Sequence, residues 1–263
     1  VKDPLEQSLI RGAARMGDRL LEEIPRLLEE SETETDLAAR AEFFYRRLGH
    51  PGVTRVRGFN IQATTGHIAA GASSALPSAS PGPTGGGGYG PYLSQGAAPV
   101  RISPREPILV DYLASVEGYY ADQARIFSIG ELPARFSEAH RVMIEIQETL
   151  ALKGLPGARA GDLYGMALEI AKKAGLGEYF MGHPQPVPFV GHGIGLELDE
   201  WPVIAKNSQH ILEEGMVIAL EPKVVFPGQG VLGIEDTFLV SERGMEKLNR
   251  FPEEIQVLPG PPT

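Results

Sequence analysis

The chain has 263 residues, of which 42% are apolar, and a formal net charge of −10 at pH 7. This length allows a substantial core in one large domain or two small ones, and the acidic balance argues against nucleic-acid binding, which uses a basic face. The absence of cysteine excludes disulfides, thiolate metal sites and a cysteine nucleophile. No apolar run approaches the ~20 residues of a membrane span, and no signal-peptide pattern opens the chain, so we expect a cytoplasmic protein without membrane contact.

The predicted elements come in alternating blocks. Apolar residues at helical spacing predict helices, and β-branched alternation between Gly/Pro-rich breaks predicts strands. Helices are expected over residues 5–30, 34–48, 133–152 and 160–175. Strands are expected over residues 53–70, 107–129, 186–198, 215–226 and 231–241, and residues 107–129 should form two strands joined near Val116–Gly118. Blocks of helices and strands, rather than a regular strand–helix alternation, indicate an α+β fold with a mainly antiparallel sheet.

Two local features qualify this pattern. Pro25 should bend or break the end of the first helix, because proline removes a backbone donor. Residues 71–100 consist of Gly, Pro, Ser and Ala with hardly a charge, which is typical of a linker or loop. This segment is either a flexible surface loop or an ordered loop lining a site, since long loops in compact domains are often functional.

Four acidic residues lie within apolar, strand-like runs. Carboxylates are rarely buried unless they are paired or bind a cation, and few lysines or arginines are near these four in sequence. One could end a strand and face water, but four together indicate a bound divalent metal. The four are Asp111, Asp122, Glu221 and Glu235.

His192 extends this candidate metal set. It lies between two glycines in "VGHGIG", a context that allows close backbone approach and presents the imidazole. One nitrogen with four carboxylates suits Mn²⁺, Mg²⁺ or Co²⁺, with Zn²⁺ as an alternative. Four carboxylates exceed what one ion needs, so two ions about 3.5–4 Å apart with shared carboxylates would balance the charge.

The motifs "VDYLASVEGYYAD", "GHGIGLELDEWP", "GMVIALEP" and "GIEDTFLV" occur in this order, after the opening helix "KDPLEQSLIRGAA". Together they resemble the M24 metallopeptidase family of methionine aminopeptidase, aminopeptidase P and prolidase, over roughly residues 2–250. The resemblance implies the pita-bread fold and one catalytic domain over residues 1–263. Related enzymes carry an N-terminal domain ahead of it, which we expect to lie outside this chain.

By this resemblance, Asp111, Asp122, His192, Glu221 and Glu235 fall on the five metal ligands. Asp122 and Glu235 would bridge two ions, Asp111 would complete one, and His192 with Glu221 the other. A bridging water would be the nucleophile, and Glu221 would carry a proton from it to the leaving amine. We expect Mn²⁺ at the centre, with Co²⁺ or Zn²⁺ as alternatives, and a homodimer as one option for assembly.

The sequence departs from the family pattern where relatives hold the substrate. Asp199 stands in place of a histidine, Pro77-Ser78 in place of "P-H", and Gly233 in place of an arginine. Ala124 replaces a threonine, and Pro188 replaces the first histidine of "H-G-T-G-H".

These changes define the substrate-binding candidates. Asp199 and Ser78 stand at the substrate positions, and loop 81–96 could supply backbone amides and the Tyr89 hydroxyl in place of lost donors. His67, on a strand leading into that loop, could point into the pocket and stand in for a missing histidine.

Three functions remain in competition. The first is a dinuclear-metal exopeptidase of the prolidase or aminopeptidase P type that cleaves Xaa-Pro bonds in short peptides. The second keeps the metal but acts as a non-peptidase hydrolase or lyase on a small polar substrate, which the replaced histidines and arginine favour. The third is a binding protein without catalysis, against which the retention of five ligand types argues.

Overall fold

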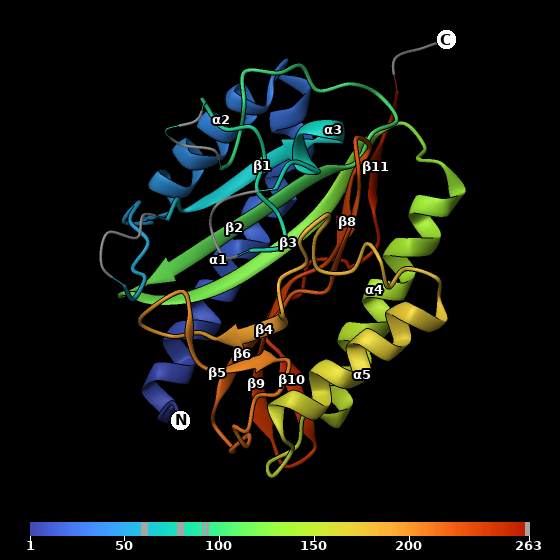
Figure 1. Ribbon diagram of the computed structural model, residues 1–263. Coiled ribbons are helices and arrows are strands. Elements are labelled where there is room, and N and C mark those ends of the chain that lie inside the picture. Colours follow the sequence, from blue (N-terminus) through green and yellow to red (C-terminus); the bar gives the residue numbers. More distant parts are fainter. Residues whose placement is uncertain (59–62, 78–81, 91, 93–94, 261–263) are drawn as a thin grey trace.

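A computed structural model describes residues 1–58, 63–77, 82–90, 92 and 95–260 (Figure 1). The helices are α1 (Pro4–Glu29), α2 (Glu34–Arg47), α3 (Gly71–Ser74), α4 (Ala134–Lys153) and α5 (Ala160–Lys173). The strands are β1 (Gly66–Ala70), β2 (Ile108–Val116), β3 (Tyr119–Ile129), β4 (Phe189–Gly193), β5 (Glu200–Ala205), β6 (Val217–Leu220), β7 (Lys223–Phe226), β8 (Gly230–Gly233), β9 (Asp236–Ser241), β10 (Gly244–Lys247) and β11 (Gln256–Leu258).

The strands form three groups that are antiparallel except for one pair. One sheet has the order β1-β2-β3-β11, a second has the order β10-β9-β6-β4-β5, and β7 pairs with β8 as a separate ribbon. Among the strands that the structure describes, only β11 runs parallel to its neighbour, β3. This confirms the predicted α+β class with a mainly antiparallel sheet.

Helices cover the sheets on opposite sides (Figure 1). α1 packs on β2 and β3, and α2 packs on β1, whereas α4 contacts β8 and β10 and α5 contacts β5. Two hydrophobic clusters result, one under α1 and α2 and one under α4 and α5. None of the helices in the described ranges is long and apolar enough to cross a membrane.

The first helix does not end at its proline. Capping by Asp3 and Glu6 begins α1, and the helix continues through Pro25 to Glu29. Leu27 and Leu28, beyond the proline, are both buried. Their packing holds the last turn helical despite the missing donor, so the expected break at Pro25 is wrong.

The hairpin of β2 and β3 matches its prediction. Glu117 and Gly118, with φ values of 50° and 84°, make the turn, as a two-residue hairpin loop with positive φ at both positions requires. The register pairs Asp111 with Ala124 and Asp122 with Leu113. Since alternate residues share a face, both carboxylates point to the same side of the hairpin.

Two predicted strands instead divide where their glutamates lie. Residues 215–226 form β6 and β7 with Glu221 at the break, and residues 231–241 form β8 and β9 with Glu235 at the break. The Glu221 N–H donates to the Val190 carbonyl at 3.0 Å, one residue beyond the last pair of the β4–β6 ladder, Gly191 with Leu220. Both glutamates therefore project from junctions between the second sheet and the ribbon.

The expected strand over residues 53–70 is largely wrong. Only Gly66–Ala70 is a strand, residues 53–58 lack regular structure, and residues 59–62 lie outside the described ranges. The Tyr120 hydroxyl contacts the backbone of Val53 and Arg55, and the Arg55 carbonyl accepts from Leu198 N–H at 2.9 Å. These isolated hydrogen bonds satisfy backbone groups of residues 53–58 without a neighbouring strand.

Candidate metal centre

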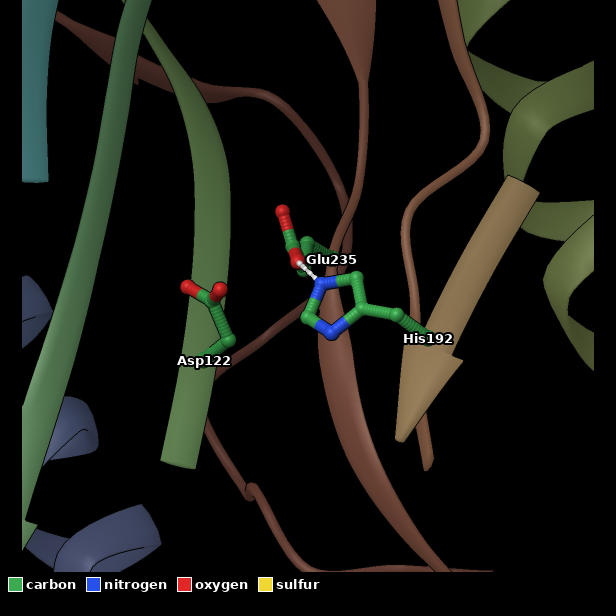
Figure 2. A group of neighbouring side chains, drawn as sticks. All are labelled: Asp122, His192 and Glu235. Carbon is green, nitrogen blue, oxygen red and sulfur yellow. Dashed lines mark ion pairs between the residues drawn. The ribbon is translucent and has the colours of Figure 1, made fainter. Parts of the chain in front are cut away.

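Three buried side chains converge from different elements. Asp122 comes from β3, His192 from β4 and Glu235 from the residue before β9 (Figure 2). One ligand atom from each lies within 4.8 Å of the other two. Two carboxylates and an imidazole at this spacing can share one divalent ion.

The histidine is oriented by its own backbone and its neighbours. His192 Nδ1 lies 3.1 Å from the Gly193 carbonyl oxygen, while Nε2 faces Glu221 Oε1 at 3.8 Å and Glu235 Oε1 at 3.9 Å. A proton on Nδ1, donated to that carbonyl, leaves the Nε2 lone pair free, as in metal-binding histidines. Burial lowers the pKa of His192, but Asp199 and the two glutamates outweigh it and raise the pKa overall.

The flanking glycines explain how the imidazole reaches this position. A Cβ on Gly191 would lie 2.4 Å from the Ala219 carbonyl oxygen, and one on Gly193 would lie 2.6 Å from that of Trp201. Neither neighbour is a flexible side chain, so no larger residue fits. Glycine on both sides lets β4 lie close to β5 and β6 with the histidine between them.

Asp122 and Glu235 are fixed through their backbones. Asp122 N–H donates to the Thr237 hydroxyl at 2.8 Å, and that hydroxyl donates to the Asp122 carbonyl at 3.0 Å. Glu235 exchanges two backbone hydrogen bonds with Ala124, of 3.1 and 3.2 Å. These contacts hold β3 against the β8–β9 junction and bring the two carboxylates together.

A buried lysine completes the cluster. Lys223, the first residue of β7, places Nζ 2.6 Å from Glu235 Oε2, 2.9 Å from Glu221 Oε2 and 3.1 Å from Asp111 Oδ2. Burial lowers the pKa of Lys223, but the three carboxylates outweigh it and raise the pKa well above its usual value. The ammonium is therefore charged at neutral pH.

The lysine does not neutralise the whole cluster. Burial, with repulsion from the neighbouring carboxylates, raises the pKa of Asp122 well above its usual value. Burial raises the pKa of Glu235 to about 8, against the opposing effect of Lys223. These shifts mean that the carboxylates still lack positive charge, which is the condition that favours cation binding.

The residues therefore fit one ion and do not fit two. One ligand atom each of Asp122, His192 and Glu235 lies within 4.8 Å of the other two, and the Glu235 oxygen near His192 Nε2 is Oε1, not the oxygen that contacts Lys223. Asp111 and Glu235, which would help to hold the ion that Asp111 completes, instead contact Lys223 through Oδ2 and Oε2, and Lys223 also contacts Glu221 Oε2.

The cluster opens into a cavity of about 110 Å³. His67 lines it and is hydrogen-bonded through Nε2 to the Thr84 hydroxyl at 3.1 Å. Thr84 belongs to the Gly-rich loop, of which Gly82, Pro83 and Gln95 also line the cavity. Residues 82–84 and Gln95 of this loop therefore lie at the site.

Asp199 also lines the cavity, at the end of the loop before β5. Its carboxylate is half-exposed and lies 3.5 Å from His192 Nδ1. Asp199 therefore contacts the histidine directly, a contact that the spacing of seven residues did not reveal.

Tyr89, another substrate candidate, does not come to the cavity in the described structure. Tyr89 is 61% exposed and is not among the residues that line the cavity. Ser78 lies outside the described residues. A role for Tyr89 would require a substrate that extends beyond the cavity.

Sequence reasoning missed Lys223. The signal was present, because "VIALEPKVVF" places a lysine in an apolar run two residues after Glu221. A lysine in such a run needs a partner for the same reason as the carboxylates do. The four carboxylates therefore find part of their positive charge in the protein itself.

Comparisons with known proteins agree with this architecture. Over 97% of its own length, this chain is 29% identical to the Xaa-Pro dipeptidase of Pyrococcus furiosus. It superposes on the dipeptidase PepE of Mycobacterium ulcerans with a TM-score of 0.82 and 26% identity, covering 98% of this chain and 62% of that one. For the X-Pro aminopeptidase of Thermotoga maritima the TM-score is 0.81 and the identity 30%, covering 98% of this chain and 64% of that one.

These similarities confirm the pita-bread fold. The chain spans 64% of the length of the Pyrococcus furiosus relative. The sequence profile described as "Metallopeptidase family M24" matches residues 8–242. The chain therefore belongs to metallopeptidase family M24.

Proposed function

We propose that this chain is a metal-dependent hydrolase of short peptides that cleaves Xaa-Pro bonds as an exopeptidase. The observation that carries the proposal is the convergence of Asp122, His192 and Glu235 at the floor of a cavity. The substrate class follows from the relatives, which are named Xaa-Pro dipeptidase and X-Pro aminopeptidase. Mn²⁺ as the native ion, a cytoplasmic location and a homodimer remain predictions.

The chain's own residues divide the work. A divalent ion held by the cluster would polarise the scissile carbonyl and lower the pKa of water. Glu221 would accept a proton from the attacking water and deliver it to the leaving amine; its Oε1 lies 3.8 Å from His192 Nε2, at the edge of the cluster. Lys223 holds the other oxygen of Glu221 at 2.9 Å and so fixes the carboxylate.

The cavity walls suggest how a peptide is held. Asp199 is a half-exposed carboxylate at the cavity, where it would attract the free ammonium group of a peptide. His67 lines the same cavity, and burial lowers its pKa, so it offers a neutral ring. An anionic group that faces the ammonium would favour cleavage near the N-terminus.

A second candidate keeps the metal and changes the reaction. A non-peptidase hydrolase or lyase is favoured by Asp199, because a carboxylate in place of a histidine repels an anionic substrate group. Gly233 in place of an arginine removes another cation from the expected set.

The test measures metal content and hydrolysis together. The protein is stripped with a chelator, reloaded with Mn²⁺, Co²⁺ or Zn²⁺, and offered Xaa-Pro dipeptides and longer Xaa-Pro peptides. We expect cleavage that disappears with the chelator and in Glu235→Gln, and that persists in the matched control Glu214→Gln, an exposed carboxylate outside the cavity. Metal-loaded protein that cleaves none of these peptides would refute the peptidase and leave the second candidate.

A further inference from the structure

Lys223 is enclosed by the carboxylates that it contacts. Its side chain is 1% exposed, and Nζ lies within 3.1 Å of Asp111, Glu221 and Glu235. An ammonium group has three N–H donors. Nζ donates to Glu221 Oε2 and Glu235 Oε2 and forms an ion pair with Asp111 Oδ2, so three carboxylates share this one cation.

The strand pair builds the lysine into this position. Lys223 faces Gly233 across the ribbon of β7 and β8, and a Cβ on Gly233 would lie 2.6 Å from Lys223 Cγ. The glycine thus leaves room for the aliphatic stem of the lysine. The Lys223 carbonyl also accepts from Met181 N–H at 2.8 Å, which fixes the backbone at its base.

The ammonium and an ion would compete for the same oxygen atoms. A divalent metal binds carboxylate oxygens at roughly 2.0–2.2 Å, and the oxygens in question already lie 2.6–3.1 Å from Nζ. An ion and an ammonium cannot both lie among them without strong repulsion. The opposite oxygens, Glu221 Oε1 and Glu235 Oε1, face His192 instead.

We propose that the ammonium of Lys223 takes the place of one divalent ion, namely the ion that Asp111 would complete. The chain then holds a single exchangeable ion, between Asp122, His192 and Glu235. Only this remaining ion rests on the proposed function. The substitution by the lysine stands on the contacts of Nζ alone.

The experiment counts bound ions. Wild type and Lys223→Ala are dialysed against saturating Mn²⁺, and bound metal per chain is measured by elemental analysis. We expect one ion in the wild type and two in the variant, in which three carboxylates lose their cation and gain space. Lys173→Ala, an exposed lysine on α5, is the matched control and should bind as the wild type does.

Electron paramagnetic resonance of the Mn²⁺-loaded wild type gives a second readout that needs no variant. An isolated-ion spectrum supports the proposal, and a spin-coupled pair overturns it. Two ions per wild-type chain, or equal ion counts in the wild type and a folded Lys223→Ala, also overturn it. No ion in the wild type but one in the variant would support the lysine substitution and refute the proposed metal-dependent function.

Discussion

Replacing Arg125 by methionine tests how the carboxylate junction is held. Arg125 is fully buried on β3, and its Nη2 donates to Asp236 Oδ1 at 2.7 Å. The methionine keeps most of the stem volume but removes the charge and every donor. The other acceptors of the guanidinium are the backbone carbonyl oxygens of Ala124, Glu235, Phe251 and Pro252, at 2.7–3.0 Å.

The expected loss of stability comes from the groups that Arg125 would leave without a partner. Asp236 is fully buried, so the substitution leaves a carboxylate without its cation and removes one donor from each of the four carbonyl oxygens. Breaking one side of a buried pair costs about 3–5 kcal/mol. In a chain of this length, that corresponds to a fall in melting temperature of roughly 5–10 °C.

The assay is urea unfolding of the metal-free protein, with circular dichroism as the signal that monitors unfolding. Removing Asp236 as well, in Arg125→Met with Asp236→Leu, should recover part of the loss, because no uncompensated charge is then buried. We also expect weaker metal binding in Arg125→Met, since Glu235 loses a donor to its carbonyl. A change in unfolding free energy below about 1 kcal/mol, the scale of an exposed ion pair, would refute the reasoning.

Three further predictions concern single positions. Asp199→Asn removes the charge 3.5 Å from His192 Nδ1, and chelator competition should show metal affinity reduced by about tenfold; equal affinity would mean that Asp199 does not act through the histidine. Burial lowers the pKa of His140 to about 4, so the unfolded chain binds this proton more readily and stability falls as pH drops from about 6.5 to 4; urea titrations should show a shallower fall for His140→Gln. Gly233→Ala would bring its Cβ 2.6 Å from Lys223 Cγ and cost about 1–3 kcal/mol; an unchanged melting temperature would contradict that crowding.

Local patterns were sufficient where neighbours in sequence are neighbours in space. The alternation and turn residues between Asp111 and Asp122 predicted the hairpin, and the structure contains it. The same alternation failed in residues 53–58, because a strand also needs a partner strand, and the hydrogen bonds of that segment go to Tyr120, Thr64 and the loop residues 196–198. Sequence periodicity carries no information about which backbone will lie alongside.

The metal centre likewise combines features that local sequence predicts with features that depend on distant neighbours. The motifs were sufficient to name the candidate ligands. They did not reveal which cation neutralises the carboxylates, because that depends on the direction in which each side chain points. Lys223 follows Glu221 by two residues, and successive strand residues alternate faces, so both can point to one side. The break of the strand at Pro222 makes that outcome unpredictable from spacing.

A lysine at this position changes what metal loss does to the site. A bound ion leaves when the free ion concentration falls, whereas the ammonium of Lys223 is covalently part of the chain and cannot diffuse away. Asp111, Glu221 and Glu235 therefore keep a common partner in the metal-free protein, and three of the four carboxylates stay oriented before an ion arrives. The ordering cost of binding is then confined to Asp122 and His192, whose backbones are already held by Thr237 and by the pairing of β4 with β5 and β6. Such preorganisation favours affinity for the single ion, and it separates the stability of the fold from metal supply.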